Sequence, residues 1–298
     1  MQASLLTNLL LPLALGIIML GLGLGLTLDD FRRVARYPRA VLIGLALQTL
    51  VLPWAAFGLA LGFGLPAELA VGLMLLAASP GGATANIYSH LARGDVALNI
   101  TLTAINSLLC LLTLPVILNL SLEYFLGAGQ YVPPPTKKVI EVAAIILLPV
   151  AIGMVVRARA AGFAARTEKP IRLLSVLVLA LLVVAAVAQE WKTLTTYFAI
   201  VGLACLLFNL ASMGAGYAAP LALRLPKKQA IAIAMEIGIH NGTLAIALAL
   251  SPALLNNPTM AIPAAIYSLI MFITAALFGL WVNRVHGAEL AHETVAEQ

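Results

Sequence analysis

The chain has 298 residues, of which 62% are hydrophobic and 10% are charged, and its formal net charge is +5. Soluble domains carry about 25% charged residues, so this composition excludes a soluble globular protein and indicates a polytopic membrane protein. The surrounding lipid bilayer then makes the basic excess a topology signal, and we expect no nucleic-acid partner.

Nine apolar runs are long enough to cross about 30 Å of hydrocarbon as helices. They occupy residues 5–26, 39–63, 67–93, 96–122, 136–157, 170–188, 195–222, 227–251 and 258–285. The first run is too long for the apolar part of a signal peptide and no basic segment precedes it, so we expect a membrane span. The predicted fold class is therefore an all-α polytopic membrane protein with nine transmembrane helices.

Basic residues are distributed unevenly between the loops. If the loop after the first run lies in the cytoplasm, alternation of the nine spans places every Lys and Arg on the cytoplasmic side except Lys137, Lys138 and Lys192. Such a bias is the positive-inside signal. It predicts a multi-pass protein with its N-terminus outside and its C-terminus in the cytoplasm. The short chain favours a cell inner membrane, and an organelle envelope is the alternative.

Two runs are interrupted by glycine near mid-depth, one on each side of a triple proline at residues 133–135. The interruptions read Ser-Pro-Gly-Gly-Ala-Thr-Ala-Asn at 79–86 and Glu-Ile-Gly-Ile-His-Asn-Gly at 236–242. The spans around them cross in opposite directions, which predicts an inverted-topology repeat with two discontinuous crossing helices. The predicted units are residues 1–132, residues 133–285 and a cytoplasmic tail at 286–298. The alternative is that proline and glycine only kink tightly packed helices.

Glu236 is the only carboxylate that lies deep within an apolar run. An unpaired charge at the bilayer centre costs about 2.5–3.5 kcal/mol on insertion scales, so an ionisable residue at this depth indicates a functional site. The glycines that follow it allow the backbone to leave helical geometry. The carboxylate and the carbonyls of Ile237 and Ile239 then offer hard oxygen ligands for a small cation.

Polar side chains on other runs have the spacing needed to complete such a site. Asn99 and Thr103 are four residues apart and share a helix face, with Asn106 one turn further on. Gln48 is an isolated amide near mid-membrane. Taken alone, Gln48 or Asn106 is better explained by an interhelical hydrogen bond, whereas the group together with Glu236 favours an ion site.

His240 has two open interpretations. A neutral imidazole would hydrogen-bond within the break, whereas a protonated one beside Glu236 would replace a metal cation as the counter-charge. The four histidines have no spacing typical of zinc, so no transition metal is expected. The sequence also lacks His-Glu-x-x-His, Gly-x-Ser-x-Gly and Walker motifs, which argues against an enzyme.

Four segments resemble the bile acid:sodium symporter family. They are Gly-Leu-Thr-Leu-Asp-Asp-Phe at residues 25–31, Pro-Gly-Gly-Ala-Thr-Ala-Asn at 80–86, Leu-Ala-Arg-Gly-Asp-Val-Ala-Leu-Asn at 91–99 and Glu-Ile-Gly-Ile-His-Asn at 236–241. The resemblance covers nearly the whole chain. It implies a core domain made of the second, third, fourth, seventh, eighth and ninth spans, and a panel domain made of the first, fifth and sixth.

The resemblance also implies two sodium sites and a substrate site. The first sodium site comprises Ala85, Asn86, Asn99, Thr103 and Glu236. The second comprises Gln48, Glu236, Ile237, Ile239 and His240. The substrate would lie against Ala83, Thr84, Asn241 and Thr243. Two positions depart from the family pattern: Ala85 stands where serine is often found, and His240 stands where the family has glutamine, whose amide oxygen suits Na⁺ better than an imidazole nitrogen.

These observations predict a secondary active symporter that imports an organic anion, either bile-acid-like or a small carboxylate, together with Na⁺ by alternating access. Na⁺ is the coupling ion, and no other cofactor is expected. Two alternatives stay open. One is proton-coupled transport of an organic anion through Glu236 and His240, and the other is a membrane receptor or scaffold that transports nothing.

Overall fold

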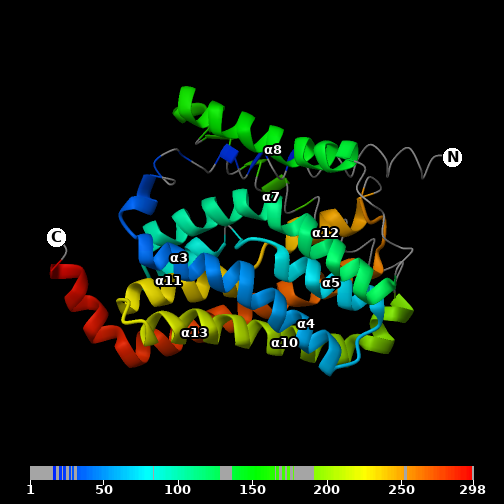
Figure 1. Ribbon diagram of the computed structural model, residues 1–298. Helices are drawn as coiled ribbons and strands as arrows, with labels where there is room; N and C mark the ends of the chain where they lie inside the picture. Colours follow the sequence, from blue (N-terminus) through cyan, green and yellow to red (C-terminus); the bar gives the residue numbers. More distant parts are fainter. Residues whose placement is uncertain are drawn as a thin grey trace.

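The computed structural model describes residues 32–82, 84–127, 136–164, 191–251 and 254–296, with single positions between 16 and 29 and between 166 and 177. These residues form a bundle of helices (Figure 1). In this part of the chain, β-structure is limited to one isolated bridge between Gly81 and His240. The all-helical character predicted from the sequence is therefore confirmed.

The helices follow one another with short connections. In chain order they are η1 Arg33–Ala35, α3 Pro38–Ala46, η2 Leu47–Val51, α4 Leu52–Gly62, α5 Ala67–Ala78, α6 Ala85–Leu91, α7 Val96–Leu126, α8 Thr136–Arg159, α10 Trp191–Ala222, α11 Lys227–Gly238, α12 Gly242–Leu250, η3 Thr259–Ala261 and α13 Ile262–Ala296. The segment η2 is a π-helical turn between α3 and α4. Such turns are rare and often lie at functional sites.

Among the described residues, three segments are long and apolar enough to cross a membrane: Pro38–Gly62, Thr195–Ala222 and Thr259–His286. The bent helix α7 adds a fourth if its halves count as one span, since they meet at 55° near residue 111. Pro115 lies inside α7 one turn beyond the bend, and a proline there removes the hydrogen bond to the carbonyl four residues earlier. These spans support a polytopic membrane protein.

The predicted number of nine spans stays a prediction. The runs at 5–26 and 170–188 fall largely outside the described residues, as does the triple proline at 133–135. Helix α8 covers the predicted run at 136–157. It lies along one edge of the bundle, beside α7 (Figure 1).

The third and eighth predicted spans are each divided in two. Helix α5 ends at Ala78 and α6 begins at Ala85, while α11 ends at Gly238 and α12 begins at Gly242. The glycine interruptions read from the sequence therefore correspond to real breaks in the helices. Kinking of continuous helices, the alternative interpretation, does not describe them.

The same type of turn precedes each of the two helices that lead into the breaks. Gly64 after α4 and Arg224 after α10 have positive φ angles of 56° and 60°. In both turns the next N–H donates to the carbonyl five residues earlier, at 2.9 Å, which is a Schellman closure. Pro66 and Pro226 then precede α5 and α11, which have 12 residues each. Two segments far apart in the sequence thus fold alike.

The two breaks pair with each other inside the bundle. Gly82 N donates to Ile239 O at 2.7 Å, and Asn241 N donates to Pro80 O at 2.8 Å. This short antiparallel contact satisfies backbone groups that have left their helices, as burial requires. Helix α11 contacts α6, α7 and α10, and α5 contacts α4, α7 and α13, so helices enclose the crossing on several sides.

Candidate functional site

Glu236 lies in the last turn of α11, and its side chain is 0% exposed. The carboxylate accepts hydrogen bonds from two side chains of α7, from Thr103 Oγ1 at 2.6 Å and from Asn106 Nδ2 at 3.2 Å. Within the described part of the chain, no basic side chain forms an ion pair with it. Two neutral donors leave lone pairs free and the negative charge unbalanced, and a buried charge is costly unless it is paired.

Gly81 brings the first break against this carboxylate. A Cβ atom at position 81 would overlap the carboxyl group of Glu236. Glycine is therefore required by the close approach of backbone to side chain. Glu236 is enclosed by α7 on one side and by the break between α5 and α6 on another.

Helices α7 and α11 contact each other in register. Asn99 Nδ2 donates to Ala232 O at 2.7 Å, and one turn later Thr103 reaches Glu236. The Thr103 hydroxyl also lies 3.0 Å from Asn99 O, but its single proton satisfies only one acceptor fully. An ionised carboxylate is the stronger acceptor and the nearer one, so we assign that proton to Glu236.

His240 lies within the second break and is 1% exposed. Its Nδ1 atom is 3.2 Å from Ser79 O. Because a carbonyl only accepts, Nδ1 carries a proton. In a neutral ring, Nε2 would then present a lone pair. The ring stacks on Phe208 and meets Tyr267 edge-on, with 5.4 Å between centroids in both cases. No hydrogen bond joins it to Glu236 among the described residues, so direct contact does not make it the counter-charge of that carboxylate.

Gln48, on the π turn η2, approaches the same carbonyl as His240. Its Nε2 atom donates to Ser79 O at 2.9 Å and to Ala77 O at 3.2 Å. Both amide protons are thereby engaged. Gln48 and His240 converge on Ser79, the residue at which α5 stops, and hold the start of the first break.

Two side chains hold the end of α11. Gly238 O accepts hydrogen bonds from Asn209 Nδ2 at 2.9 Å and from the Tyr267 hydroxyl at 2.8 Å. This carbonyl has lost its helical partner because the helix ends there, and α10 and α13 supply replacements. Asn209 and Tyr267 are not among the residues predicted from the sequence. The available signal was a polar side chain deep within an apolar span.

Several buried acceptor atoms around the breaks have no donor among the residues that the structure describes. They are Gln48 Oε1, Asn99 Oδ1, Asn106 Oδ1, Asn209 Oδ1 and His240 Nε2. The amide nitrogens of these residues face carbonyl or carboxylate oxygens, which fixes the assignment of oxygen and nitrogen. Each of these atoms offers an electron pair, and four of the five are oxygens. Together with the Glu236 carboxylate they suit a small hard cation.

The residues predicted for the first sodium site lie on α6, α7 and α11. Thr103 contacts Glu236 directly, and Asn99 lies one turn away on α7. Ala85 and Asn86 form the start of α6. Asn106, taken alone, was better explained by an interhelical hydrogen bond; the structure shows that bond, and its acceptor is the carboxylate of the site.

Residues of the second sodium site and of the substrate site surround the crossing. Ile237 is fully buried, and Ile239 O already accepts a hydrogen bond from Gly82. Thr84 and Thr243, at the starts of α6 and α12, are half-buried. The side-chain oxygen of Asn241 caps α12 by accepting from Leu244 N at 3.0 Å, which leaves its amide nitrogen for a ligand. Ala83 lies outside the described residues.

A buried carboxylate and unsatisfied oxygens at the meeting point of two broken apolar helices define a membrane transport protein. Comparison with known proteins narrows this class. The Sodium Bile acid symporter family matches residues 12–197. The chain belongs to this family, as its motifs predicted, and it is a sodium-dependent transporter rather than an enzyme.

Relatives with similar sequences are transporters from distant organisms. The uncharacterized sodium-dependent transporter YocS of Bacillus subtilis is 33% identical over 255 residues, which are 85% of this chain and 77% of that protein. A probable chloroplastic sodium/metabolite cotransporter of Oryza sativa, BASS2, is 29% identical over 277 residues, 92% of this chain and 64% of its own. Sodium/bile acid cotransporter 4 of Rattus norvegicus is 28% identical over 301 residues, with shares of 97% and 66%. The chain thus spans just under two thirds of the last two proteins.

Proposed function

We propose that this protein is a secondary active symporter that imports a small organic anion with Na⁺ by alternating access. The observation that carries the proposal is the fully buried Glu236 carboxylate, which has two neutral donors and no basic partner among the described residues. A monovalent cation beside it would balance the charge and use its free lone pairs. The names of the relatives, which are a sodium-dependent transporter, a sodium/metabolite cotransporter and a sodium/bile acid cotransporter, support Na⁺ as the ion and an organic anion as the substrate.

The first sodium ion is proposed to lie between α7, α11 and the start of α6, with ligands from Glu236, Thr103, Asn99, Asn86 and the backbone at Ala85. Support comes from the buried Asn99 Oδ1 atom, which has no donor, and from the direct contact between Thr103 and Glu236. Hard carboxylate, amide and hydroxyl oxygens are the ligands that such a cation prefers.

The second sodium ion is proposed to use Gln48, Glu236, His240 and the carbonyls of Ile237 and Ile239. The free Oε1 atom of Gln48 supports this assignment. The imidazole of His240 weakens it, since Nδ1 is engaged with Ser79 O and Nε2 is a nitrogen ligand. We therefore expect a lower affinity for Na⁺ at this site than at the first.

The anion is proposed to bind beside the crossing, against Ala83, Thr84, Asn241 and Thr243. The N–H groups at the start of α12 carry a partial positive charge that attracts a carboxylate. The free amide nitrogen of Asn241, whose oxygen caps that helix, is a further donor. Cation binding would hold the two breaks in the arrangement that presents these donors, so that ion and anion assist each other reciprocally.

The larger architecture is proposed on the same grounds. The matching turns before α5 and α11, and their equal lengths, support an inverted-topology repeat. We infer a core domain of the second to fourth and seventh to ninth spans that moves against a panel of the first, fifth and sixth. The distribution of basic residues supports an external N-terminus and a cytoplasmic C-terminus. An inner-membrane potential would then drive import, at about 2.3 kcal/mol per charge per 100 mV.

Transport by purified protein in liposomes tests the proposal. A panel of labelled bile acids and small carboxylates is offered under an inward Na⁺ gradient, under an equal K⁺ gradient, and under an inward proton gradient without Na⁺. We expect accumulation only with Na⁺, abolished when the gradient is collapsed. Accumulation driven by protons alone would favour the proton-coupled alternative. Anion binding without any accumulation would favour a receptor.

A further inference from the structure

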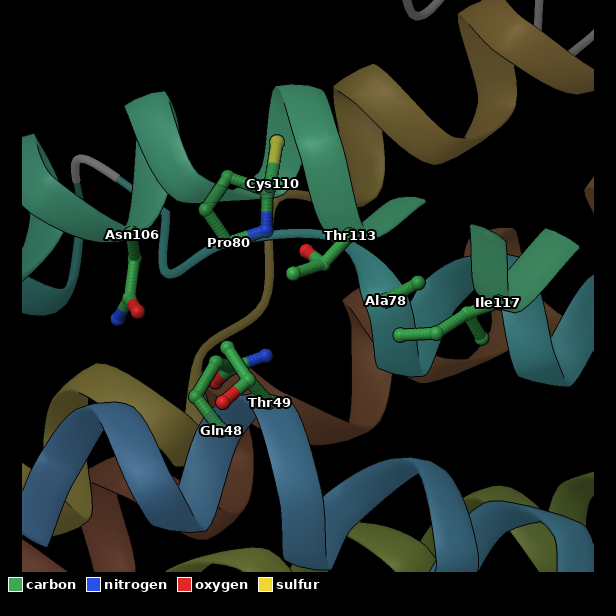
Figure 2. Close-up of a pocket in the computed structure, with 8 residues that line it drawn as sticks. All are labelled: Gln48, Thr49, Ala78, Pro80, Asn106, Cys110, Thr113 and Ile117. Atoms are coloured by element: carbon green, nitrogen blue, oxygen red, sulfur yellow. The ribbon is translucent and has the colours of Figure 1, made fainter. Parts of the chain in front are cut away.

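A small cavity lies beside the first break, next to Pro80. It is formed where the π turn η2, the end of α5 and the bend of α7 come together (Figure 2). Its lining residues are Gln48, Thr49, Ala78, Pro80, Asn106, Cys110, Thr113 and Ile117. None of residues 236 to 240 lines it, and it shares only Gln48 with the second proposed sodium site.

The hydroxyl protons around this cavity are already used. Thr49 Oγ1 donates to Leu45 O at 2.7 Å, and Thr113 Oγ1 donates to Leu109 O at 3.2 Å. Each hydroxyl therefore has only lone pairs left for a ligand. The amide of Gln48 is in the same situation, because its nitrogen is engaged with two backbone carbonyls.

Two lining oxygens are buried and have no donor, namely Gln48 Oε1 and Asn106 Oδ1. Asn106 also connects the cavity to the charged site, because its Nδ2 atom donates to Glu236 Oε1 at 3.2 Å. Figure 2 shows its amide pointing from α7 towards the helix that carries Gln48 and Thr49. The lining contains no carboxylate and no basic group.

We propose that this cavity is an additional sodium station, which shares Gln48 with the second sodium site and from which an ion reaches or leaves Glu236. The inference rests on the proposed function. Half of the lining is apolar, and the other half carries amide and hydroxyl oxygens that accept hydrogen bonds, which attract a hard cation and repel the carboxylate of the substrate. Because no ligand is charged, the ion is held weakly, which suits a site that an ion must leave quickly. Asn106 contributes its nitrogen to the carboxylate and its oxygen to the station.

Hydroxyl-to-methyl substitutions test the station without touching Glu236. The variants are Thr49→Val, Thr113→Val and their combination, and Thr113→Ser is the rescue. Thr101→Val is the matched control, because Thr101 lies on the same helix, is buried, and donates to Ala97 O at 2.8 Å but does not line the cavity. Binding of radioactive Na⁺ to the purified protein is measured by scintillation proximity, alongside Na⁺ titrations of its thermal midpoint.

We expect the double variant to bind less Na⁺ per chain at saturation, and each single variant to raise the half-saturating Na⁺ concentration about three- to tenfold, the effect of one lost oxygen contact. Thr113→Ser and Thr101→Val should behave as the native protein does. Native Na⁺ binding in the double variant, with only a shifted thermal midpoint, would overturn the station and indicate a bridging water. A native protein that binds no Na⁺ at all would overturn the proposed function, and the station with it.

Discussion

The two breaks follow helices of equal length, and a turn of the same type precedes each helix. The chemistry of the two breaks nevertheless differs. The break between α5 and α6 contains no ionisable side chain and acts through its backbone. Ser79 O accepts from Gln48 and faces His240, and Gly81 leaves room for a carboxyl group. The break between α11 and α12 carries both ionisable groups, Glu236 before it and His240 within it.

Because of this difference, neither break can form the proposed ion site alone. The charge of the second break needs the space that the first provides at Gly81. The carbonyl of the first break, Ser79 O, in turn orients the imidazole of the second. The proposed ion site therefore depends on the pair, and both breaks belong to the proposed core domain, which would carry them together when it moves against the panel.

We expect the strongest loss of Na⁺-dependent uptake when the charge of Glu236, at the second break, is removed. Glu236→Gln keeps the size of the side chain but cannot balance a cation. Breaking a buried charge pair costs about 3–5 kcal/mol, so we expect Na⁺-dependent uptake to fall at least about 100-fold. Uptake in liposomes and Na⁺ binding measure the loss. The matched control is Glu68→Gln on α5, whose carboxylate only accepts from Asn257 Nδ2 at 2.8 Å. Native Na⁺ dependence in Glu236→Gln would contradict the assignment of the site.

Substitution of a glycine in the first break should have the second strongest effect on Na⁺ binding. In Gly81→Ala the new methyl group overlaps the Glu236 carboxyl, whereas in Gly82→Ala its nearest neighbour is His240 O at 3.2 Å. Overpacking costs about 1–3 kcal/mol, so Gly81→Ala should raise the half-saturating Na⁺ concentration about 10- to 100-fold. Gly82→Ala should raise it less. Gly58→Ala is the control, because nothing lies within 4 Å of a Cβ there. Equal effects of Gly81→Ala and Gly82→Ala would argue against a specific collision with the carboxylate.

The positions of both breaks could be predicted from the sequence, because glycine within an apolar run allows the backbone to leave helical geometry, and Pro80 disfavours a helix at the first break. Helical spacing placed Asn99 and Thr103 on one face, and the resemblance to the family implied that Thr103 and Glu236 share a site. What could not be predicted are contacts set by tertiary packing. The clamp on Gly238 O by Asn209 and Tyr267 joins three helices, and no local pattern encodes it.

Backbone irregularities were equally inaccessible. The π turn η2 contains no glycine or proline, and Arg224 adopts a positive φ angle that its type disfavours. The tautomer of His240 depends on a carbonyl 161 residues away in the chain. That hydrogen bond requires a proton on Nδ1, which the neutral tautomer and the protonated ring both supply, so both interpretations of His240 stay open.

Two hydroxyl groups on α7 allow a contact with Glu236 to be compared with a hydrogen bond inside the helix, and here we expect a smaller effect on Na⁺ binding. Thr103→Val removes the 2.6 Å hydrogen bond to Glu236, whereas Ser107→Ala removes only a bond to Thr103 O in the same helix. A hydrogen bond to a charged group contributes about 1.5–3 kcal/mol, so the half-saturating Na⁺ concentration should rise about tenfold or more in Thr103→Val. Ser107→Ala should titrate as the native protein does. Equal titrations of the two variants would remove Thr103 from the site.

Substitution of His240, in the second break, should change Na⁺ binding least. His240→Gln replaces a nitrogen ligand by an amide oxygen, and the new amide N–H can still donate to Ser79 O as Nδ1 does now. A hard cation gains a better ligand, so we expect the half-saturating Na⁺ concentration to fall about threefold and the titration to steepen. The lost ring contacts with Phe208 and Tyr267 should cost about 0.5–1.5 kcal/mol each, and Phe208→Leu is the control for that loss. If His240→Gln changes stability as Phe208→Leu does but leaves the Na⁺ titration unaltered, the imidazole belongs to the packing of the break, and coupling depends on the Glu236 side alone.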